Sequence, residues 1–108
     1  MEIPLSALIR KFILMANKAR ASHILVKTEQ EARDILNKLN VGESFAKLAE
    51  QHSLCPSKKR GGSLGEFGRG QMVKEFENAV FSAKKGQIVG PVKTQFGWHI
   101  IKVEDIWG

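Results

Sequence analysis

The order of the elements along this chain predicts an α+β domain. Three observations carry that prediction: a short apolar run at residues 24–26 with two branched residues, two helix-capping patterns after it, and a final strand whose side chains alternate between two faces near residue 100. Between them, the sequence indicates the order strand, two helices, strand, helix and hairpin. This order favours an antiparallel sheet with helices packed around it.

The first predicted strand covers residues 19–27, ARASHILVK. Its branched residues Ile24 and Val26 favour extended backbone, and the run is short and mostly apolar. We therefore expect His23 to lie inside a sheet.

Two helices are predicted to follow this strand. Thr28 and Glu31 have the spacing of a capping box, so the first helix begins at Thr28 and ends near Gly42. Its inner face is formed by Ala32, Ile35, Leu36 and Leu39. Ser44 caps a shorter helix that ends near His52. The inner face of this second helix is formed by Phe45, Leu48 and Ala49.

A long loop is expected from residue 52 to residue 72, HSLCPSKKRGGSLGEFGRGQM, because five of the chain's ten glycines lie in it. The segment is too rich in glycine to be a helix, although residues 64–67 can form a short strand. Residues 73–83 then have helical spacing at Val73, Phe76 and Val80. This arrangement places Met72 and Phe76 beside one opening.

The last predicted feature is a hairpin within residues 90–106, with its turn near Phe96. Alternation in the final strand divides its side chains between two faces. One face carries His99, Ile101 and Val103, and the other carries Trp98, Ile100 and Lys102. We therefore expect His99 to lie among core residues.

Composition limits the class of protein. The 108 residues hold one cysteine and a formal charge of +6. One cysteine cannot form an internal disulfide, and no run approaches the roughly 18 apolar residues of a membrane span. We expect a monomeric protein of a reducing compartment, the bacterial or archaeal cytoplasm. The charge favours acidic partners, but it does not by itself predict nucleic-acid binding.

Residues 1–15 differ from the rest and are predicted to be an N-terminal extension, with the domain at residues 16–108. An apolar stripe at helical spacing indicates a short amphipathic helix, made by Leu5, Leu8, Ile9 and Phe12. Arg10 and Lys11 interrupt this segment, so it does not read as a secretory signal. The alternative is an upstream extension with a second start at Met15.

The single thiol raises the question of nucleophilic catalysis. Cys55 and a histidine could form a thiolate and base pair, as in a hydrolase, although a lone cysteine is more often a plain buried thiol. One cysteine and three scattered histidines lack the paired spacing of zinc sites. The segment GEFGRG lacks the strand-to-helix context of a phosphate loop. No metal or nucleotide cofactor is therefore expected.

Three blocks of sequence, read together, decide between these alternatives. ASHILVK, GGSLGEFGRGQMVKEFENAVF and GPVKTQFGWHIIKV occur in this order, and the chain resembles the parvulin family of peptidyl-prolyl cis/trans isomerases over roughly residues 18–103. The resemblance implies a four-stranded antiparallel sheet surrounded by about four helices. It also implies rotation of the peptide bond before proline, with no cofactor.

Site residues follow from the same resemblance, position by position. The family's buried histidine pair falls on His23 and His99, its cysteine-or-aspartate position on Cys55, and its hydroxyl partner on Thr94. These four are expected to form a polar floor. The family's proline pocket falls on Leu64, Met72, Phe76 and Phe96. Some relatives carry serine where Phe96 stands, so the rim should be more apolar here.

The implied function is isomerisation of Xaa-Pro bonds in unfolded or flexible segments of folding client proteins. We expect Cys55 to act as a hydrogen-bonding group, with covalent catalysis as the alternative. Parvulins that recognise phosphorylated substrates carry a basic insertion after the first strand, whereas in this chain Lys27 is followed directly by the helix cap Thr28. The resemblance therefore does not imply specificity for phosphoserine. The rival hypothesis is a non-catalytic chaperone or a basic module that binds unfolded chains or nucleic acid.

Overall fold

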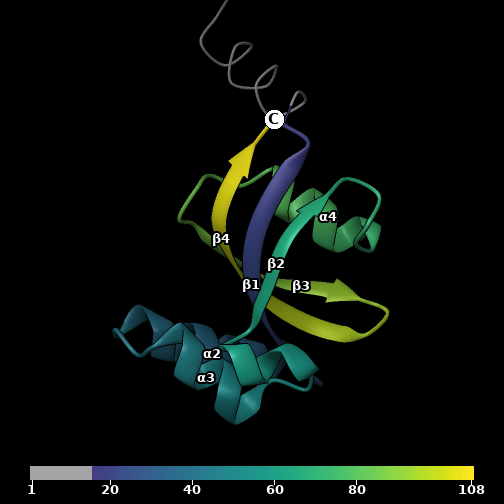
Figure 1. Cartoon of the computed structure of the whole chain (residues 1–108). Coiled ribbons are helices and arrows are strands. Elements are labelled where there is room, and N and C mark those ends of the chain that lie inside the picture. Colours follow the sequence, from purple (N-terminus) through teal and green to yellow (C-terminus); the bar gives the residue numbers. More distant parts are fainter. Residues whose placement is uncertain (1–15) are drawn as a thin grey trace, which may run out of the picture.

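The computed structural model describes residues 16–108 (Figure 1). The predicted amphipathic segment at residues 1–15 lies outside the described residues. The proposed boundary between this extension and the domain therefore stays a prediction.

A single four-stranded sheet organises the described chain. Its strands are β1 (Lys18–Val26), β2 (Ser63–Gly68), β3 (Ile88–Thr94) and β4 (Gly97–Trp107). The spatial order is β2-β1-β4-β3, and every neighbouring pair is antiparallel. The long strands β1 and β4 occupy the centre, where each pairs on both sides. The predicted antiparallel sheet and α+β class are confirmed.

Three α-helices pack around this sheet: α2 (Glu29–Asn40), α3 (Phe45–His52) and α4 (Lys74–Phe81). Both predicted caps are present, since Thr28 Oγ1 accepts from the Glu31 N–H at 3.2 Å and Ser44 Oγ accepts from the Lys47 N–H at 3.3 Å. No helix within residues 16–108 has the length and apolar content that a membrane crossing requires.

The expectation that residues 52–72 contain no helix is wrong in one place. A 3-10 helix, η1 (Pro56–Arg60), follows Cys55 directly. Pro56 stands at its first position, where the missing N–H costs nothing and the ring fixes φ. The four residues after Pro56 contain no glycine, and Gly61 ends the helix with a left-handed φ of 66°. The glycines of this segment therefore follow the helix and do not prevent it.

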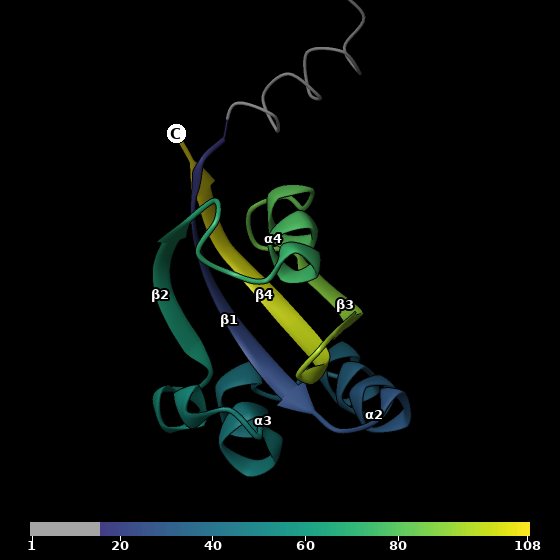
Figure 2. The same cartoon turned by 90° about the vertical axis from the view of Figure 1, so that its right-hand side faces the viewer.

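The two faces of the sheet bury different side chains. Ala21, Ile101 and Val103 pack with α4, whereas Ile24, Val26 and Ile100 pack with α2 and α3. The views in Figures 1 and 2 place α2 and α3 together at one end of the sheet and α4 toward the other end. The alternation predicted for β4 is confirmed, and it puts His99 on the face that α4 covers.

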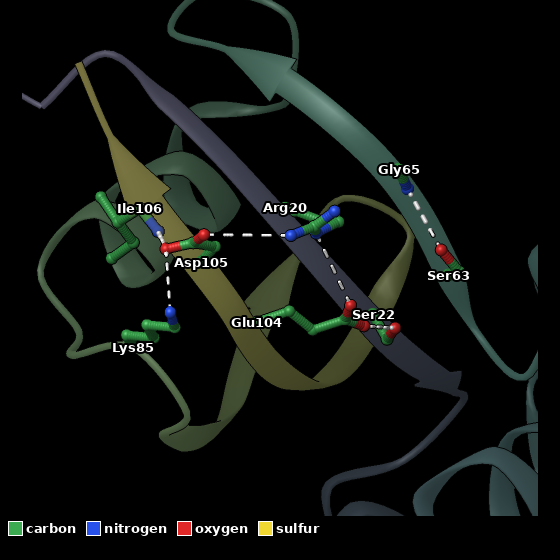
Figure 3. A network of polar contacts seen from close by, with 8 residues as sticks. All are labelled: Arg20, Ser22, Ser63, Gly65, Lys85, Glu104, Asp105 and Ile106. Carbon is green, nitrogen blue, oxygen red and sulfur yellow. Dashed lines mark hydrogen bonds and ion pairs between the residues drawn. The ribbon is translucent and has the colours of Figure 1, made fainter.

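Charged side chains join β1 and β4 at the end of the sheet nearer the C-terminus (Figure 3). Arg20 lies 4.0 Å from Glu104 and 3.9 Å from Asp105, and Lys85 lies 3.8 Å from Asp105. The hydroxyl of Ser22 donates to Glu104. The charged side chains of this network are 31% to 72% exposed. We call this group the charged network.

Candidate active site

A cavity of about 440 Å³ opens between the sheet, α4 and the loop that follows α3. Seven of the eight residues predicted for the site line it: His23, Cys55, Leu64, Met72, Phe76, Phe96 and His99. The eighth, Thr94, is buried and bonded to His99. Residues from five separate stretches of sequence are thus brought together.

Five further residues line the same cavity and were not predicted: Leu25, Leu54, Pro56, Gln71 and Val73. Alternation along β1 puts Leu25 on the same face as His23, and helical spacing puts Val73 on the same face as Phe76, so both positions carry a sequence signal. Leu54 and Gln71 lie on loops and Pro56 begins η1, where no periodicity indicates which way a side chain points.

The two histidines meet through their Nδ1 atoms, which lie 2.9 Å apart. In the register of the sheet, Leu25 stands opposite His99, so His23 is its diagonal neighbour across β1 and β4. Thr94 Oγ1 lies 2.7 Å from His99 Nε2 and accepts from the Phe96 N–H at 3.1 Å. A continuous hydrogen-bonded chain therefore runs from the β3–β4 turn to His23, and we call it the histidine chain.

Both histidines are held in the neutral form. Burial lowers the pKa of His23 to about 4, with a further contribution from repulsion by His99, and burial alone lowers the pKa of His99 to about 4. Since both rings are neutral near pH 7, one Nδ1 must donate and the other must accept. A neutral imidazole has one donor nitrogen and one acceptor nitrogen. If Nδ1 of His23 donates to His99, Nε2 of His23 is an acceptor, and if Nδ1 accepts, Nε2 is a donor. That atom is buried and has no partner among residues 16–108.

Phe76 connects the apolar part of the cavity to the histidine chain. Its ring stands edge-on to His23, with centroids 5.6 Å apart, and edge-on to His99 at 5.5 Å. Phe67 then packs against Phe76 from the core side at 6.0 Å. The position of this cavity wall is thus set by core packing.

Ser53 positions the segment that carries Cys55. Its buried Oγ accepts from the Leu25 N–H at 3.1 Å and from the Cys55 N–H at 3.3 Å, while the Leu54 N–H donates to the Leu25 carbonyl at 2.8 Å. The loop after α3 is therefore bonded to the end of β1. The thiol of Cys55 is partly buried, and its Sγ has no hydrogen bond to any described residue. Of the four residues predicted for the polar floor, three form the histidine chain and Cys55 lines the same cavity.

Close backbone contact at two glycines supports the histidine strands. The His23 N–H donates to the Gly62 carbonyl at 2.9 Å, and a Cβ on Gly62 would lie 2.4 Å from the His23 oxygen. A Cβ on Gly90 would lie 2.7 Å from the His99 oxygen. Both glycines also have positive φ, at 90° and 136°, which side chains disfavour. A larger residue at either position would push a histidine strand away.

Two side chains hold the loop that presents Met72. Gln71 Oε1 accepts from the Gly68 N–H at 2.8 Å, and Glu77 of α4 accepts from the Gly70 N–H. The loop between β2 and α4 is thus tied to the same helix that carries Phe76. Met72 and Phe76 therefore share a support.

Comparison with known proteins identifies this arrangement. The family model described as the PPIC-type PPIase domain, or rotamase domain, matches residues 13–105. The chain belongs to the parvulin family. The matches also confirm that this parvulin domain is of the peptidyl-prolyl cis/trans isomerase type.

Relatives of this parvulin domain include foldases. It is 60% identical over 89 residues to the foldase protein PrsA of Geobacillus sp. (strain WCH70), a match that covers 82% of this chain and 32% of that protein. The chain thus spans about a third of the length of the curated relatives it matches.

Solved structures agree with this assignment. The crystal structure of peptidylprolyl isomerase PrsA from Bacillus anthracis superimposes with a TM-score of 0.84 at 42% identity, covering 95% of this chain and 49% of that one. NmPin, the parvulin of Nitrosopumilus maritimus, gives 0.73 at 48% identity, covering 81% of this chain and 95% of that one. The predicted family and fold are confirmed.

Proposed function

We propose that this protein accelerates cis/trans isomerisation of Xaa-Pro bonds in unfolded or flexible segments of client proteins, and that it assists folding in this way. The observation that carries the proposal is an apolar cavity of about 440 Å³ set directly against a buried, neutral histidine pair. Such a site suits a substrate that is apolar at its ring and polar at its rotating amide.

The reaction needs little chemical apparatus. Its barrier of roughly 18–20 kcal/mol is the loss of amide resonance when the C–N bond twists. An uncatalysed Xaa-Pro bond exchanges over about 10–100 s at room temperature. Since about 1.4 kcal/mol gives a tenfold change in rate, selective stabilisation of about 5–7 kcal/mol gives a useful enzyme. Noncovalent contacts can supply this much, provided that they favour the twisted amide over both ground states.

Each part of the cavity has a proposed role. Met72, Phe76 and Phe96 grip the pyrrolidine ring, and Leu64 closes the same side. The histidine chain keeps the wall next to the ring rigid and free of charge. Twisting the amide ends its conjugation and returns the electron pair to the proline nitrogen. A hydrogen-bond donor close to that nitrogen therefore stabilises the transition state selectively.

Cys55 is proposed to act on the amide through its polarity and not as a nucleophile. A nucleophilic thiol is activated by an adjacent base, and among the described residues its Sγ makes no hydrogen bond to a histidine. The cysteine-or-aspartate pattern of the family also favours a group that accepts hydrogen bonds or carries negative charge. Covalent catalysis is the alternative that a substitution test must separate.

We propose broad substrate range without phosphate specificity. Only Lys27 and Thr28 connect β1 to α2, so a basic insertion has no place there. A cluster of three exposed cations lies on η1, after Cys55 in the chain: Lys58, Lys59 and Arg60. The expected monomeric state and reducing cytoplasmic compartment stay predictions.

Exchange NMR on short Xaa-Pro peptides tests the proposal directly. We expect the purified protein to accelerate exchange without metal or nucleotide. Met72→Ala should weaken peptide binding by about 1–3 kcal/mol, because the ring loses apolar contact. Val41→Ala is the matched control, since Val41 is 79% exposed and does not line the cavity. Peptide binding without faster exchange would replace the isomerase with the non-catalytic chaperone.

A further inference from the structure

Gln71 brings a carboxamide to a cavity whose other lining side chains are apolar, apart from Cys55 and the two neutral histidines. Its oxygen is already used, since Oε1 accepts from the Gly68 N–H at 2.8 Å. A backbone N–H can pair only with the oxygen of a carboxamide, so this contact also fixes which end of the group is the NH2. That NH2 group makes no hydrogen bond within residues 16–108.

The turn that holds Gln71 has a counterpart elsewhere in the chain. Residues 68–71 and residues 84–87 each carry a glycine in third place, Gly70 with a φ of 87° and Gly86 with a φ of 86°, which is typical of a type II turn. In each turn the last residue is a glutamine. Its N–H donates to the carbonyl of the first residue, and its Oε1 accepts from the N–H of that residue. The oxygen of either glutamine therefore stabilises the turn, whereas the NH2 group does not.

The two glutamines differ in what surrounds them. Gln71 lines the cavity, whereas Gln87 is exposed, directly precedes β3 and does not line the cavity. The turn that ends at Gln71 is also bonded to α4, because Glu77 accepts from the Gly70 N–H. Since Phe76 belongs to the same helix, the carboxamide is held in place relative to the wall that grips the proline ring. A donor that is already ordered loses little conformational entropy when it binds a ligand.

An extended client segment offers a backbone carbonyl on each side of the proline ring. Under the proposed function, the carbonyl that rotates lies toward Cys55, while Met72 and Phe76 hold the ring. Gln71 directly precedes Met72 in the chain, so it belongs to the side of the cavity that holds the ring. The acceptor for its NH2 group is then the carbonyl of proline itself, which lies on the other side of the ring from the rotating bond.

We propose that the NH2 group of Gln71 donates a hydrogen bond to the carbonyl of the substrate proline, and that this bond holds the client while the preceding amide turns. The proline carbonyl takes no part in the rotation, so the bond is equally strong in the ground state and in the transition state. Such a contact lowers KM and leaves kcat unchanged. The inference rests on the proposed function, because it assigns a binding residue to that reaction.

Gln71→Glu tests the NH2 group by itself. The substitution keeps an oxygen for the Gly68 N–H but removes the donor, so the turn is preserved. By exchange NMR on Xaa-Pro peptides, we expect KM to rise about five- to tenfold and kcat to change by less than about twofold. Gln87→Glu is the matched control, since it makes the same chemical change in the same kind of turn outside the cavity, and it should leave KM unchanged. Thermal unfolding checks that both variants fold.

A change in the substrate separates the lost hydrogen bond from the added negative charge. An ester in place of the amide bond after proline makes the proline carbonyl a weaker acceptor, because the ester lacks most of the amide resonance. The ester should raise KM about fivefold in the native protein, but by less than about twofold in Gln71→Glu, where the donor is already gone. The added charge acts on both peptides, so it cancels in this comparison.

Three results would overturn the proposal. If KM is unchanged in Gln71→Glu but raised in Gln71→Ala, which also removes the oxygen, Gln71 serves the turn alone. If Gln71→Glu lowers kcat and leaves KM unchanged, the contact is made at the rotating bond. If the ester raises KM equally in the native protein and in Gln71→Glu, the carboxamide does not bind that carbonyl.

Failure of the proposed function has a different signature. If no peptide exchanges faster, the isomerase proposal is wrong, and the comparison of amide and ester peptides is then made with dissociation constants from chemical-shift titration. An ester effect that disappears in Gln71→Glu supports the hydrogen bond even then. Equal ester effects in both proteins reject it.

Discussion

Two polar networks join the same pair of strands, β1 and β4, and they differ in every physical respect. The charged side chains of the network around Arg20 and Asp105 are partly exposed, and its ion pairs are 3.8–4.0 Å long (Figure 3). The side chains of the histidine chain are buried and neutral, with contacts of 2.7–3.1 Å. The two networks lie on neighbouring parts of one sheet.

The difference between the two networks shows that losing a hydrogen-bond partner costs more stability in a buried network than in an exposed one. Water competes for exposed charges, so each exposed pair adds about 0–1 kcal/mol and the network can be altered freely. A buried polar group that loses its partner has no water to replace it. Each contact of the histidine chain therefore matters for stability, although Nε2 of His23 has no partner among residues 16–108. Four predictions test this contrast, in order of expected effect.

Removing His99 should have the largest effect. His99→Ala deletes a buried ring and leaves His23 and Thr94 without their partner, so we expect a loss of about 3–5 kcal/mol in the free energy of unfolding. Urea unfolding at neutral pH measures it. Lys102→Ala, an exposed change on the same strand, should cost less than about 0.5 kcal/mol. A loss below about 1 kcal/mol for His99→Ala would mean that the chain is dispensable.

Acid should weaken the protein through the same two rings. The folded-state pKa values of about 4 lie below the ordinary value of 6.5, so the unfolded chain binds more protons between these values. Stability is then fully present above about pH 6.5 and is lost as the pH falls toward 4. We expect up to about 3 kcal/mol per histidine over that window. Urea unfolding at stepped pH measures the slope.

The acid effect has its own control. His99→Gln keeps hydrogen-bonding groups but cannot titrate, so it should reduce the slope between pH 6.5 and 5 by roughly half. An unchanged slope in this variant would assign the acid sensitivity to other groups.

Substitutions at Cys55 test a polar residue that borders the histidine chain without joining it. If the thiol acts by polarity, Cys55→Asp should keep much of the exchange activity, whereas Cys55→Ala should lose about tenfold or more. Exchange NMR near neutral pH measures both, after folding is checked. Equal and near-complete loss in both variants, with alkylation abolishing turnover in step with modification, would instead establish a nucleophile.

Breaking the charged network should have the smallest effect. Arg20→Ala removes contacts to Glu104 and Asp105, and we expect a loss of about 0.2–1 kcal/mol that shrinks further in about 1 M salt. Unfolding at low and high salt checks this. A loss above about 2 kcal/mol that is insensitive to salt would remove the contrast between the two networks.

Much of the fold can be predicted from local sequence patterns. The caps at Thr28 and Ser44 and the alternation through His99 each depend on residues near one another in sequence, and all are confirmed. The 3-10 helix at Pro56 was missed because the abundant glycines of its segment outweighed four helix-compatible residues that precede them.

The site residues also fall into two groups, those that the sequence predicted and those that it did not. Seven of the eight predicted residues line the cavity because the resemblance supplied positions that are distant in sequence. Ser53, Leu25 and Leu54 were not predicted, since their arrangement depends on backbone hydrogen bonds between β1 and a loop. Such bonds use groups that every residue carries, so no residue type signals them. The roles assigned to the site residues stay predictions until the variants are measured.

The pairing of His23 with His99 spans 76 positions of sequence, and it has a consequence for biosynthesis. The ribosome releases β1 before its central partner β4, which emerges only after α2, α3 and α4. During translation the histidines therefore have no cavity to border, and no N-terminal fragment ending before β4 contains the site. Since β1 and β4 must close a long loop before they pair, docking of the last strand should be a late step of folding. A nascent chain thus gains the whole site in one step, when β4 docks onto β1.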